Sequence, residues 1–215
     1  MLRSIVTALL LLSAPAAAFA ATAVAPPKGM SGVFYDGDYE IGSPKAKVTV
    51  EEYGSAVCSH CARFDAVVFP ELKAKYIDTG KIRYVFREFL TPPESVAASA
   101  FIIARCAGKT NYFKVVEDFF KAQPEMASGA PGSEPVVVLM RIAKAYGVDA
   151  DRFHACLSDE RAAQTLGSRL DHAIAAKVDS TPTIIVNGKL VEPGLGEWSL
   201  DKISPAIDNA LRGQH

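Results

Sequence analysis

Residues 47–64 read K-V-T-V-E-E-Y-G-S-A-V-C-S-H-C-A-R-F and join an apolar run to a pair of cysteines. The run from Lys47 to Tyr53 is rich in β-branched and aromatic residues, which predicts a β-strand. From Ser59 to about Thr79, apolar residues recur three and four positions apart, which predicts a helix. The two cysteines therefore lie where a strand ends and a helix begins.

A second strand is predicted directly after this helix, over residues 81–89, K-I-R-Y-V-F-R-E-F. Strand, helix and strand within about forty residues are typical of a βαβ unit, whose two strands run parallel because a crossover connects them. Pro70 lies inside the predicted helix and removes one backbone hydrogen bond, so we expect a kink there rather than an end.

The rest of the chain changes first to helix and then back to strand. Helical periodicity is present over residues 94–107, 112–123, 136–146, 151–157 and 158–177. A strand follows at 183–186, Asn187-Gly188 predicts a type I′ turn into residues 189–191, and a helix covers 199–211. This order predicts an α/β protein with a thioredoxin-like fold and an inserted all-helical domain. We expect 38–93 and 178–215 to form the thioredoxin-like domain, and 94–177 to form the insertion.

The first twenty residues have the pattern of a cleaved secretory signal peptide. Arg3 supplies the positive end, residues 5–12 an apolar core, and Ala18-Phe19-Ala20 the small-x-small cleavage signature. The apolar run is shorter than the roughly 20 residues of a membrane span and is broken by Pro15. Residues 21–37 are predicted to be a flexible leader. We therefore expect a periplasmic protein, in a compartment where disulfides persist.

Composition excludes several classes of function. The chain is 49% hydrophobic and 22% charged, with 23 basic and 24 acidic residues, a balance that argues against binding to nucleic acid or to an anionic membrane surface. The four cysteines allow three pairings. A chain with about 195 residues after cleavage can bury a proper core, so it is no disulfide-dense miniprotein.

Cys58-Ser59-His60-Cys61 could bind a metal, form a structural bridge or exchange disulfides. A zinc site lacks further ligands nearby in sequence, haem attachment would need a histidine where Ala62 stands, and a bridge across two residues constrains the unfolded chain little. At a helix start, free N–H groups and the helix dipole favour a thiolate on Cys58. We expect His60 to add to this effect and Cys61, one turn further in, to be more buried. Disulfide exchange is the favoured interpretation.

The chain resembles the DsbA family of thiol-disulfide oxidoreductases from about Asp38 to Leu211. The family carries C-x-H-C at the first turn of its first long helix, a helical insertion, and a cis proline opposite the active site, which here would be Pro182 after Thr181. The resemblance implies a buried acid beneath Cys61, at Glu52. It also implies a disulfide between Cys106 and Cys156, which a subset of the family has. Ser59 replaces the proline of the most familiar motif, at a position that tunes the redox potential.

The resemblance implies a periplasmic enzyme without a cofactor or a metal. The enzyme would donate its Cys58–Cys61 disulfide to exported cysteine-containing polypeptides, through a mixed disulfide at Cys58. A quinone-linked membrane oxidase resembling DsbB would reoxidise it. Two alternatives stay open: an isomerase or reductase of the same fold, and a copper-binding or copper-tolerance protein that uses the same thiols. No motif surrounds Trp198, and the sequence gives it no role.

Overall fold

The computed structural model describes residues 37–213. The predicted signal peptide, residues 1–20, lies outside the described residues, as does the predicted leader up to residue 36. A mixed five-stranded sheet has the order β1-β3-β2-β4-β5. Its strands are β1 (Tyr39–Gly42), β2 (Val48–Gly54), β3 (Ile82–Glu88), β4 (Thr183–Val186) and β5 (Lys189–Val191).

The pairing of the strands follows the predicted layout, with one addition. β2 and β3 are parallel, as expected of a βαβ unit, and β4 pairs antiparallel with β2. Asn187 and Gly188 both have positive φ, +47° and +78°, as a type I′ turn between β4 and β5 requires. β1 was not predicted, and it pairs antiparallel with β3 at the edge of the sheet. Its four residues are too few to give a period-2 pattern that stands out from a loop.

The first helix is shorter than predicted and continues in a different form. α1 (Ser59–Leu72) passes through Pro70, and a π-helical turn, η1 (Lys73–Ile77), follows it directly. In that turn the N–H of Asp78 donates to the carbonyl of Lys73 at 2.9 Å, a bond to the fifth residue back. The backbone thus changes geometry after the proline, at Lys73, and Gly80 with φ +71° follows.

Six further helices complete the described chain. They are α2 (Glu94–Cys106), α3 (Tyr112–Met126), α4 (Pro135–Ala145), α5 (Ala150–Leu157), α6 (Glu160–Ala175) and α7 (Leu200–Leu211). α3 extends three residues past its predicted end, through Pro124. α6 starts later than predicted because Asp159 caps it, accepting from the N–H of Arg161 at 3.0 Å. No helix in residues 37–213 combines the length and apolar character needed to cross a membrane.

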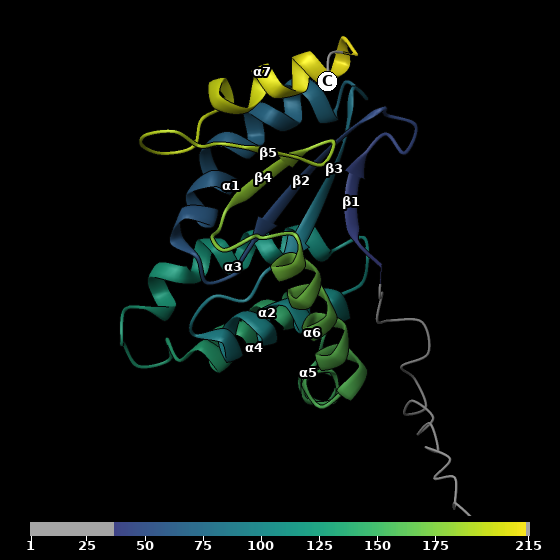
Figure 1. The fold of residues 1–215 in the computed structure, drawn as a ribbon. Helices are drawn as coiled ribbons and strands as arrows, with labels where there is room; N and C mark the ends of the chain where they lie inside the picture. The colour runs from purple at the N-terminus through teal and green to yellow at the C-terminus, as the bar shows by residue number, and fades with distance from the viewer. Residues whose placement is uncertain (1–36, 214–215) are drawn as a thin grey trace, which may run out of the picture. The chain divides into compact units, whose positions relative to one another are not determined.

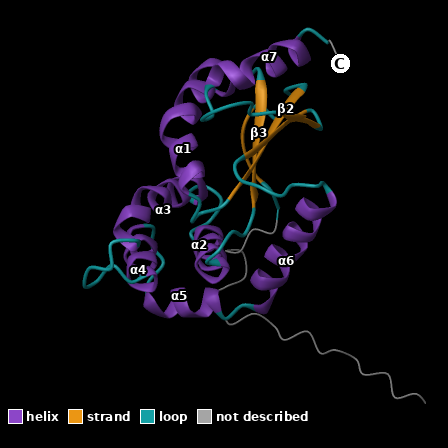
Figure 2. Ribbon diagram, turned by 60° about the vertical axis from the view of Figure 1, so that its left-hand side comes forward, coloured by secondary structure: helices purple, strands orange, loops and turns teal. Residues whose placement is uncertain are grey.

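The helices lie on both faces of the sheet. α1 and α7 are on one side and α6 is on the other, while α2 to α5 gather beyond the end of the sheet (Figures 1 and 2). α1 buries a stripe spaced three and four residues apart: Cys61, Phe64, Val68 and Leu72. On the opposite face Tyr53 packs with Ala173 of α6. The apolar stripe of α1 thereby fixes which side of the helix, and which cysteine, faces the core.

A buried ion pair attaches the inserted helices to the sheet. The guanidinium of Arg105, in α2, donates to both carboxylate oxygens of Glu88 at the end of β3, at 2.6 to 3.0 Å. The Tyr112 hydroxyl donates to the same carboxylate at 2.8 Å. Both charged side chains are 1% exposed. Removing one partner of such a pair costs about 3–5 kcal/mol, because the other charge stays buried.

Candidate active site

Cys58 is the N-cap residue of α1. Its backbone is extended, with φ −83° and ψ 118°, and its Sγ accepts a hydrogen bond from the N–H of Cys61 at 3.4 Å. The pKa of the half-buried Cys58 thiol is lowered to about 5. The largest cause is a hydrogen bond from the Cys61 thiol, and partial burial opposes it by raising the pKa. Hydrogen bonds from the Thr181 side chain and from the backbone N–H groups of Cys61 and His60 lower the pKa of Cys58 further. Cys58 is therefore largely a thiolate at neutral pH.

Cys61 has the opposite character. It is a free thiol like Cys58, but its side chain is fully buried. Burial is the main cause that raises the pKa of Cys61 well above its usual value, followed by the hydrogen bond to Cys58 and the charge of Glu52. Two thiols one helical turn apart thus differ strongly in acidity and in access to solvent. This division distinguishes a reactive thiol that a substrate can reach from a buried thiol that it cannot.

Glu52 lies in the interior, in the middle of β2. It is 2% exposed, and the hydroxyl of Tyr84 donates to its Oε2. Burial raises the pKa of Glu52 to about 8, against the Tyr84 hydrogen bond that lowers it, and the charges of Asp65 and Cys58 raise it further. Because its charge also acts on Cys61, this carboxyl is close enough to respond to the state of the buried thiol.

The loop at Thr181-Pro182 lies beside Cys58, although 123 residues separate them in sequence. The Thr181–Pro182 bond is cis, and the Thr181 carbonyl oxygen is 3.4 Å from the Sγ of Cys58. Trp198 supports this loop, because its Nε1–H donates to the Pro182 carbonyl at 3.2 Å. Its ring packs edge-on against the ring of Phe64, with 6.4 Å between the ring centroids. Sequence reasoning missed Trp198. Its only signal was a single tryptophan after a glycine-rich segment.

Ser59 and His60 are both exposed at the start of α1. The Nδ1 of the His60 imidazole lies 3.6 Å from Oε2 of Glu197, and the same oxygen is 3.4 Å from Nε of Arg63. His60 lowers the pKa of Cys58 through its backbone N–H. His60 therefore acts on Cys58 through its main chain in this structure, and an effect of its side chain stays a prediction.

Comparison with known proteins places this chain in a family. A family model described as Thioredoxin matches residues 36–209. The chain belongs to the thioredoxin family. Alpha-DsbA1 from Wolbachia pipientis is 26% identical, with a TM-score of 0.70 over 82% of this chain and 92% of that one. This confirms the predicted resemblance to DsbA and the thioredoxin-like fold with a helical insertion.

Two further comparisons agree with this placement. A relative from Rickettsia bellii, provisionally named a protein-disulfide oxidoreductase, is 37% identical over 82% of this thioredoxin-family chain and 65% of its own length. BdbD from Bacillus subtilis has the same fold, with 23% identity and a TM-score of 0.71 over 82% of this chain and 94% of that one. The chain spans 62% to 65% of the length of the Rickettsia relatives that it matches.

Gln123, from the inserted helices, also holds the active-site backbone of this thioredoxin-family protein. Its amide Nε2 donates to the carbonyl of Ala56 at 2.9 Å and to that of Cys58 at 3.2 Å. The side chain thus ties α3 to the turn that carries the reactive thiol. Nothing around Gln123 in the sequence distinguishes it from an ordinary helix residue, because its partners are more than 60 positions away.

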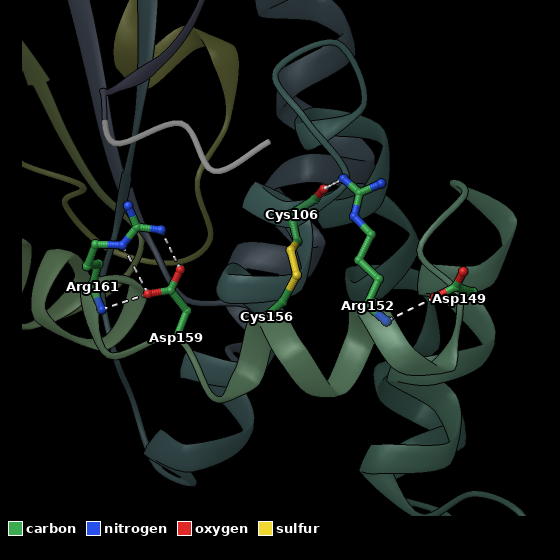
Figure 3. Close-up of a disulfide and its surroundings, with 6 residues drawn as sticks. All are labelled: Cys106, Asp149, Arg152, Cys156, Asp159 and Arg161. Carbon is green, nitrogen blue, oxygen red and sulfur yellow. Dashed lines mark hydrogen bonds and ion pairs between the residues drawn. A yellow bond between two sulfur atoms is a disulfide. The ribbon is translucent and has the colours of Figure 1, made fainter. Parts of the chain in front are cut away.

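The other two cysteines form a disulfide between α2 and α5 (Figure 3). Cys106 and Cys156 are fully buried, and their Cα atoms are 6.4 Å apart. Arg152 donates to the Cys106 carbonyl at 2.6 Å, and the carboxylate of Asp149 caps the start of α5 (Figure 3). Among residues 37–213, no group of three or more His, Cys, Asp or Glu side chains is arranged to hold a metal ion.

Proposed function

We propose that this protein is a periplasmic thiol-disulfide oxidoreductase that donates the Cys58–Cys61 disulfide to exported polypeptides. The observation that carries the proposal is the contrast between the two thiols, an acidic and accessible Cys58 against a buried Cys61 with a raised pKa. Membership of the thioredoxin family and the names of the Rickettsia relatives and of alpha-DsbA1 support it.

The first step forms a mixed disulfide. A substrate thiolate attacks the Sγ of Cys58 in the oxidised protein, a new bond forms between the two sulfurs, and the Cys58–Cys61 bond breaks. Cys61 leaves with the electron pair and takes up a proton, since its pKa lies well above the usual value. Glu52, whose pKa is about 8, is mostly protonated at neutral pH and is the proposed source of that proton.

The second step releases the product. Another substrate thiolate attacks the substrate sulfur of the mixed disulfide, and Cys58 leaves as a thiolate. Its lowered pKa makes it a good leaving group and stabilises the reduced protein, so the disulfide is passed on rather than kept. The substrate gains a disulfide, and the protein gains the two electrons as a dithiol.

The remaining predicted residues and partners have proposed roles around this chemistry. The backbone of Thr181, next to Cys58 and before the cis Pro182, would pair with an extended substrate segment. Ser59 and His60 would adjust the potential through their position beside the reactive sulfur. Reoxidation requires an electron acceptor, for which we propose a quinone-linked membrane oxidase resembling DsbB.

Two measurements on the full chain test the proposal together. We expect the alkylation rate of Cys58 to reach half its maximum near pH 5, and the reduction potential to lie above about −180 mV, in the range of oxidising proteins. The reduced form should accumulate when the protein oxidises an unfolded dithiol polypeptide. An alkylation midpoint near pH 9 together with a potential near the roughly −270 mV of thioredoxin would assign the protein to reduction instead.

A further inference from the structure

The turn before α1 depends on a side chain from the insertion. Residues 55–58 form this turn, in which the N–H of Cys58 donates to the Ser55 carbonyl at 3.0 Å. Ala56 is 1% exposed, and no backbone N–H of the described residues donates to its carbonyl. The amide Nε2 of Gln123, in α3, donates to that carbonyl at 2.9 Å. Because a buried carbonyl without a partner destabilises a fold, this hydrogen bond helps the turn to keep its shape.

The same amide also holds the first carbonyl of α1. The Nε2 of Gln123 donates to the Cys58 carbonyl at 3.2 Å, and the N–H of Ala62 donates to it at 3.0 Å. The direction of this carbonyl fixes the peptide plane between Cys58 and Ser59, and with it the orientation of the first helical turn relative to the Sγ of Cys58. In that orientation the N–H of Cys61 donates to the Sγ at 3.4 Å.

The turn is held from two sides. At its start, the Oγ of Ser55 accepts from the N–H of Thr91 at 3.3 Å and from its hydroxyl at 2.8 Å. Thr91 follows β3, so this contact comes from the end of the sheet. At its end the turn is held by Gln123, whose helix α3 packs against α1. The shape of the reactive turn thus depends on the insertion as well as on the sheet.

We propose that Gln123 is a positioning residue for the reactive thiol, and that its two hydrogen bonds keep the helix N–H groups aimed at the Sγ of Cys58. This inference rests on the proposed function and adds a residue of the insertion that determines how strongly the protein oxidises. Gln123 carries no charge and acts through the backbone of the turn. Without it the N–H groups are less well aligned, the Cys58 thiolate is less stable, and the reduced protein is less favoured.

Two substitutions of Gln123 test this role in the reduced full chain, by the pH dependence of Cys58 alkylation. Gln123→Met has nearly the same length and no donor. Its alkylation midpoint should rise from near pH 5 to about pH 6, a tenfold loss of thiolate, which is the size expected of one aligned hydrogen bond to a charged group. Gln123→Lys can donate to both carbonyls and adds a positive charge, so its midpoint should stay at the wild-type value or fall below it.

A direct competition separates an effect on the thiolate from a general effect on the fold. Reduced Gln123→Met is mixed with oxidised wild type and a trace of glutathione, and the oxidised fraction of each protein is read by acid quenching, alkylation and intact mass. At pH 7 the disulfide should pass to the variant with an equilibrium constant of about ten, which corresponds to about 30 mV. At pH 4, where Cys58 is protonated in both proteins, the constant should fall to about one.

A matched control and a replacement variant complete the design. Gln164→Met makes the same substitution at an exposed position of α6 and should behave as the wild type in both measurements. Should Gln123→Met not fold, Gln123→Asn takes its place, because its amide is one methylene too short to reach both carbonyls.

Several outcomes would overturn the inference. An unchanged midpoint in Gln123→Met would do so, as would a midpoint that rises equally in Gln123→Met and Gln123→Lys. A preference that is as large at pH 4 as at pH 7 would assign Gln123 to the stability of the oxidised form and not to the thiolate. The proposed function is judged on the wild type alone: a midpoint near pH 9 and a potential near that of thioredoxin would contradict it, whatever Gln123→Met does.

Discussion

Cys58 and Cys61 stand three residues apart at the start of α1, whereas Cys106 and Cys156 are 50 residues apart and join two helices of the insertion. The first pair is present as thiols, with one sulfur half-exposed and surrounded by hydrogen-bond donors. The second pair is bonded and fully buried. The same side chain is thus made reactive in one place and inert in the other by its access to solvent and by the groups around it.

The two pairs also differ in how much a bridge between them stabilises the fold. A bridge across 50 residues removes many conformations from the unfolded chain, so it stabilises the fold. A bridge between Cys58 and Cys61 closes only a small loop and stabilises little by that route. The surroundings that make Cys58 acidic favour the reduced form instead. We therefore expect changes at one pair to alter chemistry and changes at the other to alter stability.

The largest expected effect is on activity, from changes at the first pair. Cys58→Ser should abolish the oxidation of dithiol substrates, because no sulfur is left that a substrate can reach. Cys61→Ser should still form a mixed disulfide at Cys58 when offered an activated disulfide substrate. The adduct should persist, since no second thiol resolves it. Peptide oxidation assays and intact-mass measurements check both outcomes.

Substitution of the second pair is the control for this result. The double variant Cys106→Ala with Cys156→Ala should oxidise the same peptides at close to the wild-type rate, measured well below its unfolding temperature. Activity that survives in Cys58→Ser but disappears in the double variant would reverse the roles that we assign to the two pairs.

The next effect in size is the loss of stability in that double variant. Chain-entropy estimates for a loop of 50 residues give about 4 kcal/mol, or roughly a thousandfold in the folding equilibrium. Urea unfolding of the double variant and of the wild type measures it, with the Cys58–Cys61 pair reduced selectively in both. A difference below about 1 kcal/mol would show that the two helices are held together by packing rather than by the bridge.

The secondary structure around Cys58 and the order of the elements could be predicted from sequence, because both depend on patterns among residues that are close together in the chain. The strand before Cys58, the helix after it and the hairpin turn at Asn187-Gly188 each depend on residues within a few positions of one another. Local patterns fix secondary structure and the placement of a motif at a helix start. The same local patterns predict the order of strands and helices, and this order indicates the thioredoxin-like fold.

The parts that sequence did not reveal depend on contacts between distant residues. Trp198 supports the loop at Pro182, Gln123 holds the turn at Cys58, and Arg105 reaches Glu88. Each side chain has an ordinary local context and gains its role only when the sheet and the insertion come together. The backbone N–H of His60 lowers the pKa of Cys58, while its imidazole lies near Glu197, because sequence shows that a residue is near but not where its side chain points.

The smallest effect, and the sharpest test of how the first pair is surrounded, concerns Glu52. Burial raises the pKa of this carboxyl to about 8, whereas in the unfolded chain it ionises near 4.5. Between these values the unfolded chain releases a proton that the folded chain keeps, so the Glu52 contribution to stability is full below pH 4.5 and is lost as pH rises towards 8. Glu52→Gln cannot ionise, and its amide oxygen can still accept from Tyr84.

We therefore expect Glu52→Gln to be more stable than the wild type by about 1–3 kcal/mol at pH 7 and equally stable at pH 4. Urea unfolding of both reduced proteins at the two pH values measures the difference. Glu51→Gln, at the neighbouring position, is the control: it removes an ion pair with Arg87 at 3.0 Å and should gain nothing. A Glu52→Gln protein with no gain at pH 7 would mean that burying the Glu52 carboxyl beside the reactive pair does not destabilise the fold.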